Sequence, residues 1–434
     1  MRGLNSLPKN VRYQRQSLDD AKNAMASFRK AIAVLPREPE PETASSYLLY
    51  GPEDAGAVEP TESDYAALAT WCQAGKASLE AVDAGLRCDA LQFPATDGFG
   101  AGWASVLELI AGLLKVSHLL AIKAKLLERN GDMDMSTREL LKLYRMGQLI
   151  CNGDGLIVCY LAGSGIRSRA LNQLQVAVQS KQLTSTTARV AQEELLRATR
   201  SEEGLAQAHR IELIHFSIPT VERIPETDHY EQLIDYLVEQ HYETSLFSDM
   251  DDSAVKVSQP IRDERQALRK RQLNQLLAGH PKAFDREETI RILVQVISRY
   301  IGWLDFVMRS PNSRWRHRVR DMAAKWSRIE SLIDTDGAWP ESLAPSFPFE
   351  LFGEDEAAEA ARKKFSYTAD GEFPPAWRPL SPSNLANCNQ LLRRVANPVG
   401  KILAAQQMTM DASQLCFEHY RLLNSTIQAL ARQI

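Results

Sequence analysis

The sequence contains none of the short motifs that mark the common catalytic sites. It has no GxxxxGK(S/T) or GxGxxG loop that would hold a phosphate, and no GxSxG nucleophile elbow. Gly163-Ser164-Gly165 lies inside a helical pattern with no strand before it, so it predicts close helix packing and not an elbow. These absences argue against nucleotide-loop and serine-hydrolase functions, and we predict no cofactor.

Cysteine is also scarce, with six residues in a chain of 434 and no CxxC pair. Zinc knuckles and thioredoxin-like sites need that spacing, so the cysteines are predicted to be buried free thiols. One alternative stays open: Cys72 and Cys88 could pair across a helix and its exit loop, provided that the compartment is oxidising.

The chain has little net charge and no uninterrupted apolar run. Its formal charge of −4 gives no strong field for a polyanion. The most apolar stretch, residues 103–127, contains Glu108, Lys115, Lys123 and Lys125, whereas a membrane span needs about 20 nearly uncharged residues. The opening segment MRGLNSLPKNVRYQRQ carries charge but lacks the apolar core of a signal peptide. We therefore expect no membrane span and, on this ground, a cytoplasmic location.

Helical periodicity dominates the remaining sequence. Two capping boxes support it, Thr61 with Asp64 and Ser136 with Glu139, while the proline- and glutamate-rich residues 36–60 predict an extended segment. The predicted helices cover residues 21–34, 61–84, 103–129, 136–151, 156–179, 184–200, 202–216, 229–243, 261–278, 287–308, 313–333, 383–407 and 411–433. The pattern predicts an all-α fold, built as an irregular antiparallel helical bundle or a short α-solenoid.

Residues 336–385 differ from this helical background. Prolines, aromatics and turn pairs replace the helical period, which predicts a small loop-rich module with a β-hairpin around residues 365–373. The expected organisation has four parts: an N-terminal helix and extended segment (1–60), a main helical domain (61–335), the loop-rich module (336–385) and a C-terminal helix pair (386–434).

Three segments in the middle of the chain, NGDMDMSTRELLKLYRMGQLI, DGLIVCYLAGSGIRSRALNQL and SEEGLAQAHRIELIHF, resemble a group of uncharacterised, largely helical bacterial proteins. The later segment DGAWPESLAP…FPFELFG…FSYTADG is similar to the HG-x-YP-x-x-L…DPF…Y motif of pseudopilin C-terminal regions. Here Asp336 stands where that motif has a His before Gly337, and Pro348-Phe349 lacks the preceding Asp. The resemblance covers residues 100–370. It implies a helical architecture and an extracytoplasmic or envelope location, since related chains often begin with one membrane span.

Glu212 and His215 are the best candidates for metal ligands. Their i, i+3 spacing places both side chains on one helix face, as in carboxylate-bridged di-metal bundles. A second pair with this spacing, Glu226 and His229, follows Pro225 and is expected in a loop. Too few residues separate the two pairs for facing helices, so surface or capping roles compete with metal binding.

Residues 309–328 form the strongest basic segment. Arginines alternate with tryptophan and histidine there, a combination that suits nucleic acid or anionic headgroups. The candidate polyanion-binding residues are Arg314, Arg316, Arg318 and Arg320. Their spacing distributes them around a helix, and the acidic residues 350–359 follow closely. An internally paired, solvated helix face is therefore the competing explanation.

No complete catalytic constellation emerges from the sequence, which favours a non-catalytic helical scaffold or binding protein over an enzyme. Its grooves between helices would hold a partner, and we expect a protein partner in preference to nucleic acid. Two alternatives come from the candidate residues: a polyanion binder that uses residues 309–328, and a metal-dependent enzyme that uses Glu212 and His215.

Overall fold

The computed structural model is all-α, which confirms the fold class predicted from the helical periodicity. It describes residues 7–15, 18–19, 22–39, 43–50, 58–96, 101–198, 204–224, 267, 284–308, 397 and 411–434, and within these residues no strand forms. The elements are η2 (Lys9–Val11), α1 (Met25–Ala33), α2 (Thr43–Tyr50), α3 (Glu62–Ala74), α4 (Lys76–Gly85), α5 (Ala101–Arg129), α6 (Met133–Cys151), α7 (Ile157–Gln179), α8 (Ser185–Ala198), α9 (Gly204–Glu212), the π-helical turn η4 (Leu213–Ser217), α10 (Ile218–Arg223), α13 (Arg286–Met308) and α18 (Asp411–Ala431).

The chain divides into two compact units. Unit 1 comprises Met1–Arg12 and Ser217–Asp411, and unit 2 comprises Tyr13–Phe216 and Ala412–Ile434. The domain boundaries expected from composition stay predictions. The loop-rich module and β-hairpin expected at 336–385 lie outside the described residues, as do nearly all of the helices expected at 229–243, 261–278, 313–333 and 383–407.

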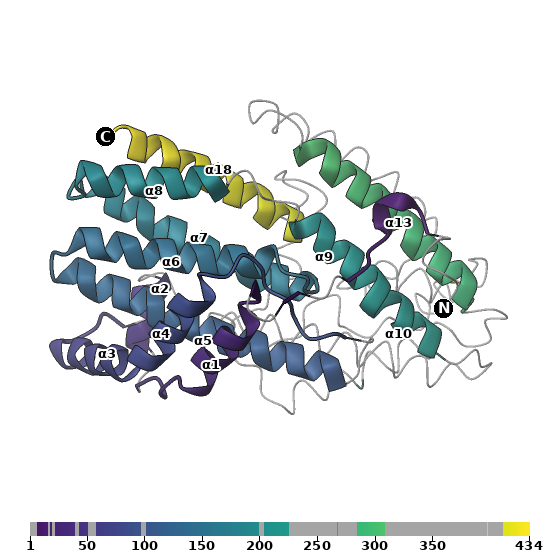
Figure 1. Ribbon diagram of the computed structural model, residues 1–434, viewed down its shortest axis with the longest axis horizontal. Helices are drawn as coiled ribbons and strands as arrows, with labels where there is room; N and C mark the ends of the chain where they lie inside the picture. The colour runs from purple at the N-terminus through teal and green to yellow at the C-terminus, as the bar shows by residue number, and fades with distance from the viewer. Residues whose placement is uncertain are drawn as a thin grey trace, which may run out of the picture. The chain divides into compact units, whose positions relative to one another are not determined.

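The long helices α5, α6 and α7 form the centre of unit 2 (Figure 1). α6 and α7 approach so closely that a Cβ atom on Gly147 would lie 2.6 Å from the carbonyl oxygen of Gly163. Gly163 is equally restricted, whereas a Cβ atom on Gly165 would meet nothing within 4 Å. Of the two α7 glycines that the sequence indicates for packing, only Gly163 therefore has that role.

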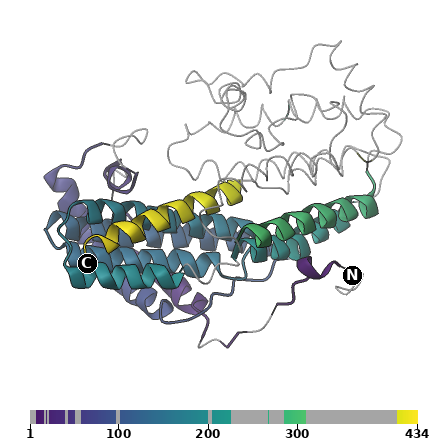
Figure 2. The ribbon, with the colours of Figure 1, turned by 90° about the horizontal axis from the view of Figure 1, so that it is seen from above.

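α18 lies along this helical core (Figure 2). The His419 ring stacks on the Tyr144 ring of α6 with centroids 5.8 Å apart, and the Tyr144 hydroxyl lies 3.3 Å from His419 Nε2. Farther along, Gln175 of α7 donates a hydrogen bond to the Ser425 hydroxyl at 3.2 Å. Unit 2 thus closes its core with the last helix of the chain.

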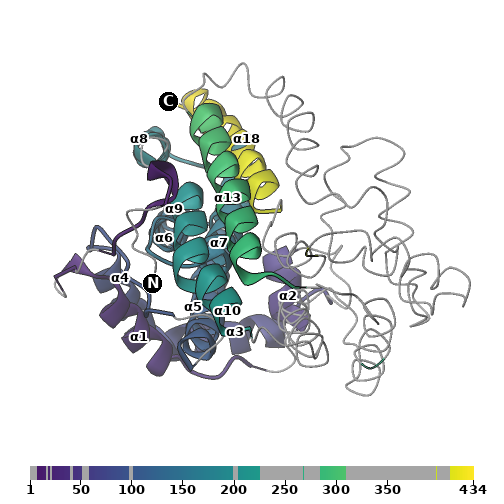
Figure 3. The same ribbon diagram turned by 90° about the vertical axis from the view of Figure 1, so that its right-hand side faces the viewer.

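α5 is the one helix in the described part of the chain whose length and apolar composition would let it cross a membrane. Most of its apolar stretch is buried inside the protein, and it contacts α1, α2, α3, α4, α6 and α7 (Figure 3). A central core helix and a membrane span share this composition. The expectation that the chain has no span stays a prediction.

Local capping chemistry explains the start of α3. The Thr61 hydroxyl accepts the Asp64 N–H at 3.3 Å, and the Asp64 carboxylate accepts the Thr61 N–H at 2.8 Å, which confirms this capping box. The continuous helix expected at 61–84 is wrong, because Gly75 divides it into α3 and α4; a Cβ atom there would lie 2.6 Å from Leu119 of α5. The extended segment expected at 36–60 contains α2 instead.

The second predicted capping box is wrong. α6 begins at Met133, because the Asp132 carboxylate accepts the Met135 N–H at 3.1 Å, so that Ser136 lies buried inside the helix. Glu139 is 2% exposed and pairs with Lys123 at 3.1 Å and with Lys142 at 3.2 Å.

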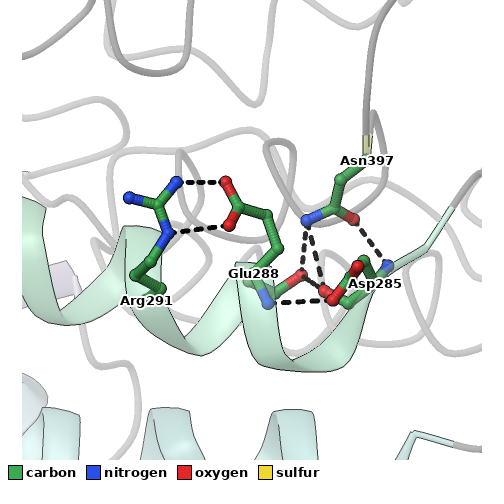
Figure 4. A network of polar contacts seen from close by, with 5 residues as sticks. Asp285, Glu288, Arg291 and Asn397 are labelled. Carbon is green, nitrogen blue, oxygen red and sulfur yellow. Dashed lines mark hydrogen bonds and ion pairs between the residues drawn. The ribbon is translucent and has the colours of Figure 1, made fainter.

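Unit 1 places α13 against α10 and the short helix η2 (Figures 1 and 3). Asp285 caps α13 by accepting the Glu288 N–H at 2.9 Å, and Glu288 in turn holds Arg291 through both carboxylate oxygens (Figure 4). Asn397 reinforces this cap: its Oδ1 accepts the Asp285 N–H at 2.9 Å, and its Nδ2 donates to Thr289 Oγ1 at 2.9 Å. Asn397 has a φ of 54°, a conformation that asparagine tolerates better than most residues.

Candidate functional site

The loop between α6 and α7 holds a partly buried carboxylate, Asp154, at the centre of a polar network in unit 2. Asp154 Oδ1 accepts the Phe93 N–H at 2.7 Å, and Oδ2 accepts Gln92 Nε2 at 2.9 Å. Arg15 Nε pairs with Asp154 Oδ2 at 2.9 Å, and its Nη2 donates to the Phe93 carbonyl. Two segments distant in sequence, residues 13–15 and 90–96, are thereby fixed to the start of α7.

Burial dominates the electrostatics of this network. It raises the pKa of Asp154 above its ordinary value, although the bonds from Gln92, Arg15 and Phe93 act in the opposite direction. Burial also raises the pKa of Tyr13 to about 12, with a smaller contribution from the nearby Asp154 charge. Tyr13 therefore remains protonated at neutral pH and can act only as a neutral donor or acceptor.

Glu212 occupies the amino end of α7. It is the last residue of α9, and its Oε2 accepts the Ile157 N–H at 3.1 Å, which satisfies one of the donors that a helix start leaves unpaired. The residue is partly accessible, yet its carboxyl group lies among protein atoms, and burial raises its pKa to about 7. Glu212 therefore changes its protonation state near neutral pH.

Cys159, in the first turn of α7, lies near enough to the Glu212 and Asp154 carboxylates for their charges to act on its thiol. Burial raises the pKa of its thiol, and the charges of Glu212 and Asp154 raise it further. A Cβ atom on Gly155 would lie 2.6 Å from the Cys159 Cβ, so the loop needs glycine at this position. Since a nucleophilic cysteine requires a lowered pKa, Cys159 is an inert, packed thiol.

His215 lies in the π-helical turn η4, and its ring meets the edge of the Tyr13 ring with centroids 5.9 Å apart. Both side chains line a cavity of about 10 Å³ together with Arg15, Asp154 and Cys159. That volume corresponds to about one water molecule. We call Tyr13, Arg15, Asp154, Cys159, Glu212 and His215 the α7 cluster.

The structure places the two predicted metal ligands, Glu212 and His215, in this cluster. Glu212 serves as a partner for the Ile157 backbone, and His215 contacts Tyr13. Within the described residues, no group of three or more His, Cys, Asp or Glu side chains gathers as a metal site would require. Metal binding by Glu212 and His215 stays a prediction. The second pair, Glu226 and His229, lies outside the described residues.

A larger, open groove adjoins the α7 cluster and shares Arg15 with it. Its volume is about 280 Å³, close to the lower end of the range of small-molecule sites. We call it the Arg29 groove. It is lined by Arg15, Asn23, Met25, Ala26, Arg29, Gln92, Phe93, Pro94 and Ala95.

The remaining candidates concern other parts of the chain. Arg314, Arg316, Arg318 and Arg320 lie outside the described residues, so the polyanion surface stays a prediction. Cys72 and Cys88 are free thiols, and burial raises the pKa of Cys72 to about 12.

Sequence reasoning missed Arg15, Asp154 and Arg29 as site residues. The only local signal was the Asn-Gly-Asp-Gly turn at 152–155, which marks a loop but does not identify its distant partners. Comparison with protein-family models, with curated proteins and with solved structures returned no match. The resemblance to helical bacterial proteins and the expected protein partner therefore stay predictions.

Proposed function

We propose that this chain is a non-catalytic helical binding protein that takes a small molecule in the Arg29 groove. The observation that carries the proposal is the groove itself, whose volume of about 280 Å³ approaches that of common small-molecule sites. Its lining places polar side chains (Arg15, Asn23, Arg29 and Gln92) beside apolar residues, so both kinds of ligand contact are available.

Preorganisation supports this proposal. Three hydrogen bonds and ion pairs to Asp154 fix Arg15, Gln92 and Phe93 on one side of the groove. Asn23 joins the start of α1 to the segment that contains Gln92. Its Oδ1 accepts the Met25 N–H at 3.1 Å and the Gln92 N–H at 3.0 Å. A groove whose walls are already held loses little conformational entropy on binding.

The α7 cluster favours binding over catalysis. All of its titratable groups except Glu212 line a cavity of about one water molecule, which leaves no space for a substrate between them. The Cys159 thiol has a raised pKa, and Glu212 already accepts a backbone N–H. These groups therefore support the shape of the neighbouring groove.

Ligand-observed NMR with a fragment set of anionic, neutral and cationic compounds tests the proposal. Ala26 is exposed and lines the groove, so Ala26→Trp should fill it and abolish binding. Ala69→Trp, at an exposed position of α3 outside the groove, is the matched control and should retain binding. If no fragment binds in a manner that depends on Ala26, the proposed function is wrong.

A further inference from the structure

Arg29 gives the groove a positive charge that no described acidic side chain pairs with. Its side chain is exposed on α1 and lines the groove, and within the described residues it forms no hydrogen bond or ion pair. No aspartate or glutamate belongs to the described lining. An arginine in such a setting offers a planar fork of donors that matches a carboxylate or a phosphate group.

Arg15 adds further donors from the opposite segment. Its Nε is bound to Asp154 and its Nη2 to the Phe93 carbonyl, so the guanidinium is held in one orientation. Its Nη1 has no partner among the described residues. Because Arg15 is already fixed, a ligand that binds Nη1 does not have to immobilise the side chain.

The side-chain amide of Asn23 provides another hydrogen-bond donor to the groove. Its oxygen is occupied by the N–H groups of Met25 and Gln92, and its Nδ2 has no partner within the described residues. The available side-chain groups of Arg15, Asn23 and Arg29 are therefore all donors. A ligand that supplies acceptors and negative charge would satisfy them, whereas a cation would not.

We infer that the Arg29 groove binds a small organic anion, whose carboxylate or phosphate group meets Arg29, Arg15 Nη1 and Asn23 Nδ2. This inference rests on the proposed function and names the ligand class of the same groove. Ala26, Pro94 and Ala95, which are at least partly exposed, supply the apolar surface against which the body of the anion packs. The side-chain acceptors of Asp154 and Asn23 are already occupied by protein donors.

Isothermal titration calorimetry at low salt with four probes tests the inference on the full chain. The probes are benzoate, phenyl phosphate, the neutral benzamide and the cationic benzylammonium. We expect the two anions to bind about tenfold more tightly than benzamide, a difference of about 1.4 kcal/mol, and benzylammonium to bind more weakly than benzamide. Tighter binding of benzoate assigns a carboxylate ligand, and tighter binding of phenyl phosphate assigns a phosphate ligand.

Two substitutions on α1 separate a specific contact from a general field. Arg29→Gln should remove most of the preference for anions, while Lys30→Gln, on the exposed neighbour that does not line the groove, should change anion affinity less than about twofold. Both positions are exposed, so neither variant is expected to disturb folding.

Three results would overturn the inference: equal affinities for benzoate and benzamide, anion binding that Arg29→Gln does not weaken, or no binding of either anion. Equal affinities that Ala26→Trp abolishes would leave the binding function intact and refute only the ligand class. The fragment set tested with Ala26→Trp decides the binding function separately.

Discussion

The raised pKa of Glu212 makes a quantitative prediction about stability. Its carboxyl group is buried at the amino end of α7, and its pKa rises from 4.5 to about 7. Glu212→Gln keeps the side-chain size and an oxygen that can accept the Ile157 N–H, but it removes the titration. The comparison of the two proteins therefore measures the effect of the charge.

A carboxyl group whose pKa is raised by folding makes the protein less stable as the pH rises, because the unfolded chain releases the proton before the folded chain does. The loss begins above pH 4.5, where the unfolded chain releases the proton, and it is complete once the folded group ionises above pH 7. Between pH 5 and pH 8 the linkage relation gives a loss of about 2.5 kcal/mol for the wild type. The stability of Glu212→Gln relative to the wild type should thus be about 2.5 kcal/mol greater at pH 8 than at pH 5.

The histidines with a lowered pKa change the stability in the opposite direction, because they destabilise the protein as the pH falls. Burial lowers the pKa of His118 and His209 to about 3 and that of His419 well below its ordinary value. Each of them reduces stability as the pH falls below 6.5, because the unfolded chain then binds a proton that the folded chain does not. Both proteins carry these histidines, so their effect cancels in the difference between wild type and variant.

Urea-induced unfolding, followed by far-UV circular dichroism at pH 5, 6, 7 and 8 and constant salt, measures this difference. Glu108→Gln, which changes an exposed carboxyl group on α5, is the control and should show no comparable change with pH. If the free energy of unfolding of Glu212→Gln relative to the wild type is the same at pH 5 and pH 8, the assignment of a buried, titrating carboxyl group is refuted.

Three further predictions follow from described contacts. Gly163→Ala should lower the free energy of unfolding by about 1–3 kcal/mol, because the new Cβ atom would enter the α6 backbone, whereas Gly165→Ala should raise it by up to about 1 kcal/mol. Urea titration of both variants measures these changes, and equal effects would contradict the close crossing of α6 and α7. Asn397→Ala should cost about 1–2 kcal/mol by removing the support of the α13 cap, measured by thermal unfolding, and an unchanged midpoint would contradict that role. Elemental analysis of protein purified without chelator tests the predicted metal ligands Glu212 and His215. Because no third His, Cys, Asp or Glu gathers with them among the described residues, we expect no stoichiometric metal, and stoichiometric zinc that His215→Ala removes would establish the site instead.

The sequence predicts those features of the fold that depend on neighbouring residues. The Thr61–Asp64 box, for example, opens α3 as its spacing predicts. The Ser136–Glu139 box does not form, for two reasons. Asp132, a competing local cap, starts α6 earlier, and ion pairs with lysines of α5 and α6 occupy Glu139. Local pattern alone cannot rank such competitors, since tertiary contacts decide between them.

The candidate site was predictable only in part. Glu212 and His215 were selected from their spacing, and they do lie in the α7 cluster, but η4 interrupts the regular helix on which that spacing argument depends. Arg15 and Asn23 become site residues through contacts with Gln92 and Asp154, far away in the chain, and Arg29 lines the same groove. No periodicity or motif encodes those contacts.

The ion pair between Arg15 and Asp154 also has a practical consequence for protein production. A truncation that removed the residues before α1 would delete Arg15 and leave the partly buried Asp154 carboxylate without its cationic partner. Such a shortened protein would be expected to misfold or to protonate Asp154. Affinity tags and protease sites therefore belong upstream of Tyr13, with the residues that follow it left intact.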